Sequence, residues 1–131
     1  MITILLQKII YYLTIIAHKE STPVTKDITD QVTLHDDHLE ENTTVFNVKK
    51  YGHLVEVNIG YMMNNATFNA TELIMSGLPK PIHAVSPYLW DYNYKRFVRL
   101  RLNTNGELLV WYTGWNYRRP ARNIFTYITE E

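Results

Sequence analysis

The chain has 131 residues, no cysteine, and 13 Lys plus Arg against 13 Asp plus Glu. This length fits one domain with at most one appended element. The lack of cysteine excludes disulfides, thiol chemistry and metal sites built on cysteine. Zero net charge predicts no nucleic-acid partner, because phosphate binding normally leaves a basic excess, and it makes self-association easier.

The most apolar stretch, residues 1–17, predicts an amphipathic helix within residues 1–20. Its apolar side chains follow alternating three- and four-residue steps, which is the spacing of a heptad seam. Ile at the first position of such heptads favours assemblies of more than two chains, so we expect a homotrimer. The seam that we predict as the oligomer interface consists of Ile2, Leu5, Ile9, Tyr12, Leu13 and Ile16.

Three other interpretations of this helix compete with the seam. Ile4 and Ile10 make other faces apolar as well, which is typical of a helix that packs into its own domain. Gln7 and Lys8 interrupt the apolar run, which argues against a membrane span. No positive charge precedes Ile2, which argues against a signal peptide. The pattern therefore favours an oligomerising or packed helix over a membrane partner.

After the helix the chain becomes polar and then β-rich. Residues 21–44 are acidic and predict a linker, with one short strand around residues 28–34. From Val45 onward apolar and polar residues alternate on both sides of Tyr51-Gly52-His53, which indicates a hairpin with one buried face. The sequence thus places the start of a β head domain at Val45.

The next segment is punctuated by proline. Leu78-Pro79-Lys80-Pro81 predicts an extended edge segment, because each proline lacks the N–H that a central strand needs. Residues 82–89 predict one more strand, which ends near Pro87.

A second hairpin gives the clearest local signal. Residues 97–102 alternate strictly, Asn105-Gly106 suits a tight turn, and residues 107–112 run back. Residues 124–129 predict a last strand. Short strands separated by turns predict a mainly β fold, an antiparallel β-sandwich or small barrel over residues 45–131, preceded by the N-terminal helix.

Two aromatic segments are the candidate ligand-binding surface. Flat rings beside Asn, Asp and Arg suit saccharides, whose C–H faces lie on rings while their hydroxyls take hydrogen bonds. Subunit interfaces and cores use the same residues, so these alternatives stay open. We expect the second segment to be a functional loop rather than core, because it interrupts the strand pattern. The candidate residues are Trp90, Tyr92, Tyr94, Trp115, Tyr117, Arg118 and Arg119.

Metal and catalytic signals are weak. His35-Asp36-Asp37-His38 has ligand residue types, but neighbouring residues point to different faces, and we interpret it as a solvated loop. No nucleophile signature accompanies His53 or His83. Four scattered acids are the candidates for glycoside cleavage. We therefore expect neither metal nor cofactor, and no enzymatic activity. The four acids are Glu56, Glu72, Asp91 and Glu107.

The order of the β features resembles the C-terminal receptor-binding or head domains of tail-fibre and baseplate proteins from phages of Gram-positive bacteria. The likeness covers about two thirds of the chain, although each motif alone is generic β chemistry. Its features are Lys50-Tyr51-Gly52-His53-Leu54-Val55-Glu56-Val57-Asn58-Ile59, Gly77-Leu78-Pro79-Lys80-Pro81, Asn105-Gly106-Glu107 and Thr126-Tyr127-Ile128-Thr129.

The resemblance implies a trimeric β-sandwich head in a virion tail that binds a host cell-surface saccharide or another tail component. Two departures stand out. The family's long fibre portion is missing from these 131 residues, and Leu78-Pro79-Lys80-Pro81-Ile82 replaces the usual Gly-Phe-Arg-Pro-like segment. The alternative is a small secreted or surface-anchored bacterial carbohydrate-binding module, held through residues 1–17.

Overall fold

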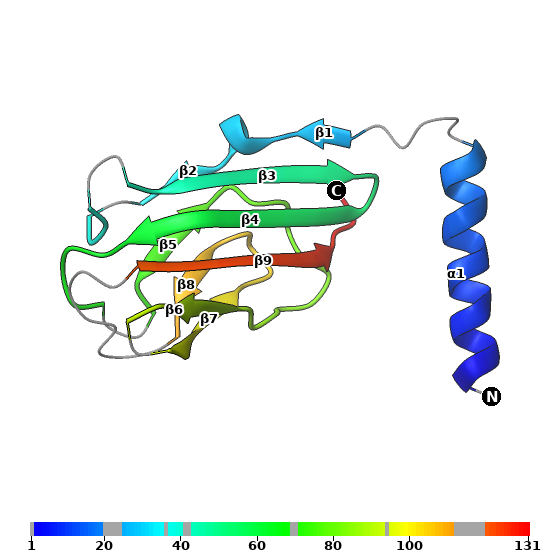
Figure 1. Cartoon of the computed structure of the whole chain (residues 1–131). Helices are drawn as coiled ribbons and strands as arrows, with labels where there is room; N and C mark the ends of the chain where they lie inside the picture. The colour runs from blue at the N-terminus through cyan, green and yellow to red at the C-terminus, as the bar shows by residue number, and fades with distance from the viewer. Residues whose placement is uncertain are drawn as a thin grey trace.

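The computed structural model describes residues 2–19, 25–35, 37–40, 43–68, 71–93, 95–111 and 120–131, and within the helix the side chains of residues 3–13. These residues form one helix, one 3₁₀ turn and nine strands (Figure 1). The elements are α1 (Ile2–Lys19), β1 (Thr25–Asp27), η1 (Thr29–Gln31), β2 (Thr33–Leu34), β3 (Val45–Tyr51), β4 (Leu54–Met63), β5 (Leu73–Ser76), β6 (Tyr88–Asp91), β7 (Arg96–Leu102), β8 (Leu108–Val110) and β9 (Pro120–Ile128).

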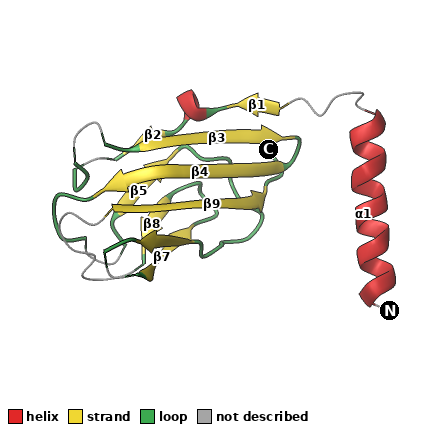
Figure 2. Ribbon diagram, viewed as in Figure 1, coloured by secondary structure: helices red, strands yellow, loops and turns green. Residues whose placement is uncertain are grey.

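The nine strands form a single curled sheet in the order β1-β3-β4-β9-β6-β7-β8-β5-β2. Every pairing between these strands is antiparallel. The curl makes a half-barrel, in which β3, β4 and β9 form one wall and β5 and β8 lie behind them (Figure 2). The prediction of a mainly β, antiparallel fold with an N-terminal helix is therefore confirmed.

Both predicted hairpins are present, and each turns at a glycine with positive φ. Gly52, at φ +58°, joins β3 to β4. Gly106, at φ +84°, lies in the turn between β7 and β8, where Asn103 N donates to Glu107 O. A Cβ at Gly106 would lie 2.2 Å from the backbone oxygen of Leu78, so this turn excludes any side chain. Local turn chemistry in the sequence was sufficient to place these two hairpins.

The segment expected to be a linker contributes to the head instead. β1 pairs with β3, and β2 pairs with β5, so residues 25–34 join the two opposite edges of the curled sheet. Ile28 and Val32 are buried between these edges, and Ile28 N donates to Val48 O. The head therefore begins at β1 rather than at Val45. β2 falls within the short strand expected around residues 28–34, whereas β1 was not expected, because three residues have no alternation long enough for a sequence pattern to reveal.

The proline-punctuated region also differs from expectation. The strand expected within residues 82–89 begins only at Tyr88, after Pro87, and before it Val85 makes an isolated bridge to Leu102. The segment Leu78-Pro79-Lys80-Pro81 is held by a buried hydrogen bond, 2.7 Å long, that the hydroxyl of Tyr127 donates to the backbone oxygen of Pro79. Burial raises the pKa of this hydroxyl. The proline segment itself lies outside the named strands and runs beside the end of β9, where Pro81 makes an isolated antiparallel bridge to Thr129.

The core lies in the hollow of the half-barrel. Its side chains come from the inward positions of the strands, which alternate with exposed or half-buried positions, most regularly along β4 and β7. The fully buried apolar side chains include Val48, Val55, Val57, Ile59, Met62, Phe68, Ile74, Met75, Leu89, Val98, Leu100, Leu102, Leu108 and Val110.

Helix α1 lies apart from the sheet (Figure 1). All side chains described for it, residues 3–13, are exposed, so they do not pack against the core. The seam residues Leu5, Ile9, Tyr12 and Leu13 are 47–62% exposed. Within the part of the chain that the structure describes, no helix is long and apolar enough to cross a membrane.

The position of Ile28 generates a stability prediction. Ile28→Ala should lower the free energy of unfolding by about 2–5 kcal/mol, because it empties a buried site where the two sheet edges meet. Chemical denaturation measures this loss. Ile82→Ala is the matched control, because Ile82 is 43% exposed and outside the strands, and it should cost under about 0.5 kcal/mol. Equal losses in the two variants would show that residues 25–34 do not hold the sheet edges.

Candidate functional site

The outer face of the sheet carries aromatic side chains where a solvated face is usually polar. Along β6 and β7, Tyr88 and Phe97 are exposed and Trp90 is half-buried, while Leu89 and Val98 between them are buried. The ring of Phe97 lies edge-to-face against both neighbours, 5.1 Å from the centroid of Trp90 and 5.8 Å from that of Tyr88. These ring–ring contacts stabilise the orientation of the three rings on the outer face of the sheet.

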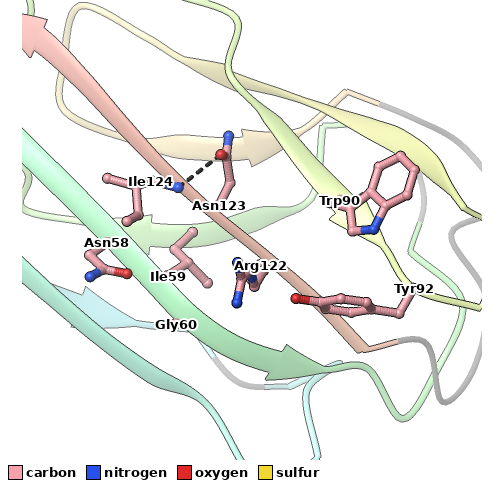
Figure 3. A pocket seen from close by; sticks show the side chains of 8 residues that line it. All are labelled: Asn58, Ile59, Gly60, Trp90, Tyr92, Arg122, Asn123 and Ile124. Atoms are coloured by element: carbon pink, nitrogen blue, oxygen red, sulfur yellow. Dashed lines mark hydrogen bonds between the residues drawn. The ribbon is translucent and has the colours of Figure 1, made fainter.

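A groove of about 620 Å³ lies beside these rings (Figure 3). Antiparallel pairing places Trp90 of β6 directly opposite Arg122 of β9, so their side chains leave the sheet on the same face. Figure 3 shows the hydroxyl end of Tyr92 directed toward Arg122. The groove spans β4, β9 and β6, and it is lined by Asn58, Ile59, Gly60, Trp90, Tyr92, Arg122, Asn123 and Ile124.

An irregularity in β4 forms the floor of this groove. Ile59 pairs with Asn123 and Met62 with Ala121, so Arg122 faces two residues of β4 that lack a regular partner. One of them is Gly60, which is exposed and has no side chain to fill the space. Bulges of this kind re-aim side chains and are frequent next to functional sites. The hollow therefore results from the bulge and the glycine together.

Hydrogen bonds to backbone groups fix polar side chains in and behind the groove. The Oδ1 atom of Asn123 accepts from the N–H of Ile124 at 2.8 Å, and its Nδ2 donates to the backbone oxygen of Tyr88. Behind the groove Asp91 is fully buried, and its Oδ1 accepts from the N–H of Asn93 at 2.9 Å. This hydrogen bond orders the turn that carries Tyr92. The groove thus combines fixed rings, amides and one guanidinium.

Of the predicted ligand-binding residues, the structure brings Trp90 and Tyr92 into this groove. The others, Tyr94, Trp115, Tyr117, Arg118 and Arg119, lie outside the described residues.

Three polar residues that line the groove were not predicted from the sequence: Asn58, Arg122 and Asn123. For Arg122 the sequence does hold a signal, because alternation along the last strand puts this residue at an outward position. Its neighbourhood, however, depends on the pairing of β4, β9 and β6, which no local pattern specifies.

The histidine segment lines another, smaller hollow at the β5–β2 end of the sheet order. His38 Nδ1 contacts a carboxylate oxygen of Glu72, and His35 Nε2 lies 2.8 Å from the hydroxyl of Ser76. Phe68 packs edge-to-face on His38 at 5.3 Å. Over the described ranges, which omit residue 36, no three His, Asp or Glu side chains come together as metal ligands would.

The acids considered for glycoside cleavage lie on four different parts of the fold. Glu56 is on the outer face of β4, Glu72 precedes β5 beside His38, Asp91 is buried at the end of β6, and Glu107 is in the β7–β8 turn. None of them lines the groove. The groove itself therefore offers binding groups and, among the residues described there, no carboxylate for acid–base chemistry.

A comparison with models of known protein families and with curated protein sequences finds no match.

Proposed function

We propose that the chain is a non-enzymatic, saccharide-binding head module that works as a homotrimer. The groove between β4, β9 and β6 is the observation that carries this proposal. Trp90 and Tyr92 supply ring surfaces for the C–H faces of a sugar, and Asn58 supplies an amide for its hydroxyls. The sides of the groove are held by strand pairing and hydrogen bonds, so little ordering accompanies binding.

The trimer part of the proposal rests on α1. Its predicted seam side chains Leu5, Ile9, Tyr12 and Leu13 remain uncovered in the single chain. A cluster of exposed apolar side chains of this size marks an association surface in most soluble proteins. Packing three copies along the heptad seam would cover these side chains without involving the sheet, and it would bring three grooves into one assembly.

The setting that this arrangement suits best is a phage or prophage tail, where a trimeric β head binds a host cell-surface saccharide or another tail component. The order of the β features resembles such heads, and the mainly β architecture is compatible with the resemblance. In that setting the protein is located in the virion. Measuring the oligomeric mass separates this setting from the alternative, a surface-anchored carbohydrate-binding module that needs no trimer.

Two substitutions test the groove as the binding site, one by removing a side chain from it and the other by filling it. Trp90→Ala removes a ring surface and Gly60→Leu fills the hollow, where a Cβ would meet Val45 O at a comfortable 3.5 Å. Both should abolish retention on those glycans of an array that the unmodified protein binds. Gly60→Leu should leave the melting temperature within about 2 °C, because surface changes of this kind cost little. Undiminished glycan binding by both variants would place the site elsewhere.

A third substitution tests the seam. Ile9→Asp should convert a trimer into monomers, because a charge buried in the seam without a partner costs several kcal/mol. Gln7→Asp is the matched control, because it adds the same charge at a polar position of the helix and should leave the trimer intact. Light scattering at micromolar concentration measures both. A monomer mass for the unmodified protein would contradict the trimer.

A further inference from the structure

The charges of this neutral chain are unevenly distributed along it. Residues 95–122 contain seven Lys and Arg but only one acid, Glu107. Residues 20–56 contain eight Asp and Glu but only three Lys. The overall balance therefore conceals a basic part and an acidic part, and such asymmetry points to a charged partner even when the total is zero.

The fold places three of these arginines on one surface. Leu100 and Leu102 of β7 and Ala121 of β9 are buried, so Arg99, Arg101 and Arg122 at the alternating positions face outward. These strands flank β6, which carries the exposed rings. The same face therefore combines guanidinium groups with aromatic rings.

These three arginines are not equally available for a ligand. Arg101 donates to the side chain of Asn103 at 2.9 Å and lies over the ring of Trp111, 5.3 Å from its centroid. Arg99 has a long contact, 3.4 Å, to the hydroxyl of Ser86. Arg122 is exposed in the groove and forms no ion pair among the described residues. Its planar fork of donors is therefore available to an acceptor on a ligand.

The surroundings of Arg122 favour a negative ligand group. No Asp or Glu lines the groove where it is described. Glu56, the acid on the outer face of β4, is opposite Thr126, which is four residues and about 13 Å along β9 from Arg122. Glu56 is also held by the hydroxyl of Tyr51 at 3.3 Å and pairs across the sheet with Lys49. Its field at Arg122 is screened at physiological salt, where the Debye length is about 8 Å.

We infer that the groove recognises an anionic saccharide, with Arg122 binding a carboxylate, phosphate or sulfate group while the sugar ring lies against Trp90. This inference rests on the proposed saccharide-binding function and adds the charge of the ligand. The direct cross-strand pairing of Trp90 and Arg122 sets their Cβ atoms about 5 Å apart on one face, so a sugar ring against the indole and an acidic group on that ring can be contacted together.

A long polyanion such as single-stranded nucleic acid fits the surface less well. Such ligands need a continuous basic track, with neutralisation of several phosphates. Here Arg101 is already engaged by Asn103 and Trp111, and the part of the chain before Glu56 is acidic. The arrangement suits one or two negative groups at a local site.

The experiment compares neutral and acidic glycans on one array, with uronic-acid, phosphodiester-linked and sulfated members identifying the kind of anion. Arg122→Gln should weaken binding of the acidic members about tenfold or more, because it removes a charge-assisted hydrogen bond, and should change binding of neutral members less than about twofold. Lys26→Gln, which removes the same charge on β1, about 14 Å of strand spacing from β9, should change neither. Added NaCl should weaken acidic binding in the unmodified protein.

Three other outcomes would each overturn a definite claim. Retention of neutral glycans only, lost in Trp90→Ala but not in Arg122→Gln, would overturn the anionic ligand and leave the saccharide-binding function standing. Retention of no glycan at all would overturn the function itself. Tighter binding of labelled oligothymidylate than of any acidic glycan, lost in Arg122→Gln, would replace the saccharide with nucleic acid. Displacement of acidic glycans by millimolar inorganic phosphate would support the anion site.

Discussion

Closure of the curled sheet by residues 25–34 is the constraint on which the rest of the structure depends. β1 and β2 pair with strands at opposite ends of the sheet order, and the 3₁₀ turn between them places Ile28 and Val32 over the core. Without this connection both edges of the half-barrel would expose unpaired backbone groups and the apolar interior beneath them. The same connection contacts Gly77, where an added Cβ would lie 2.6 Å from Gln31 O. A short acidic segment thus determines how far the sheet can open.

Closure of the interior also explains why the outer face is available for binding. The inward positions of β4, β6, β7 and β9 satisfy the core, so their outward positions are not needed for folding. The residues at these outward positions can therefore be replaced to suit a ligand without changing the core. The bulge at Gly60 then lowers one part of the surface beside Arg122 and Trp90. A flat sheet face becomes a groove through one irregularity in pairing.

Sequence patterns predicted the parts of this fold that are local. The alternation in residues 97–102, the Asn105-Gly106 turn and the N-terminal helix were predicted correctly, because each depends on neighbouring residues. In the closing segment one short strand was predicted around residues 28–34, where β2 lies, but β1 and the pairing with both sheet edges were not, because such short strands show no alternation. Trp90 and Tyr92 were predicted from residue type, whereas Arg122 was missed because it meets Trp90 only through the pairing of β6 with β9, about thirty residues apart in the chain. Net charge carries no information on the distribution of charge, because it averages an acidic part with a basic part.

The most direct test of the central claim, that the groove between β4, β9 and β6 is the binding surface, is a chemical-shift titration of the isotope-labelled protein with the acidic glycan that it binds most tightly. The account predicts the largest changes at the indole N–H of Trp90, the amide of Gly60 and the Nε–H of Arg122, with little change along β1 or in residues 3–13. Unchanged signals at Trp90, Gly60 and Arg122 at saturating glycan, with changes confined to the helix or to the hollow beside His38, would contradict it.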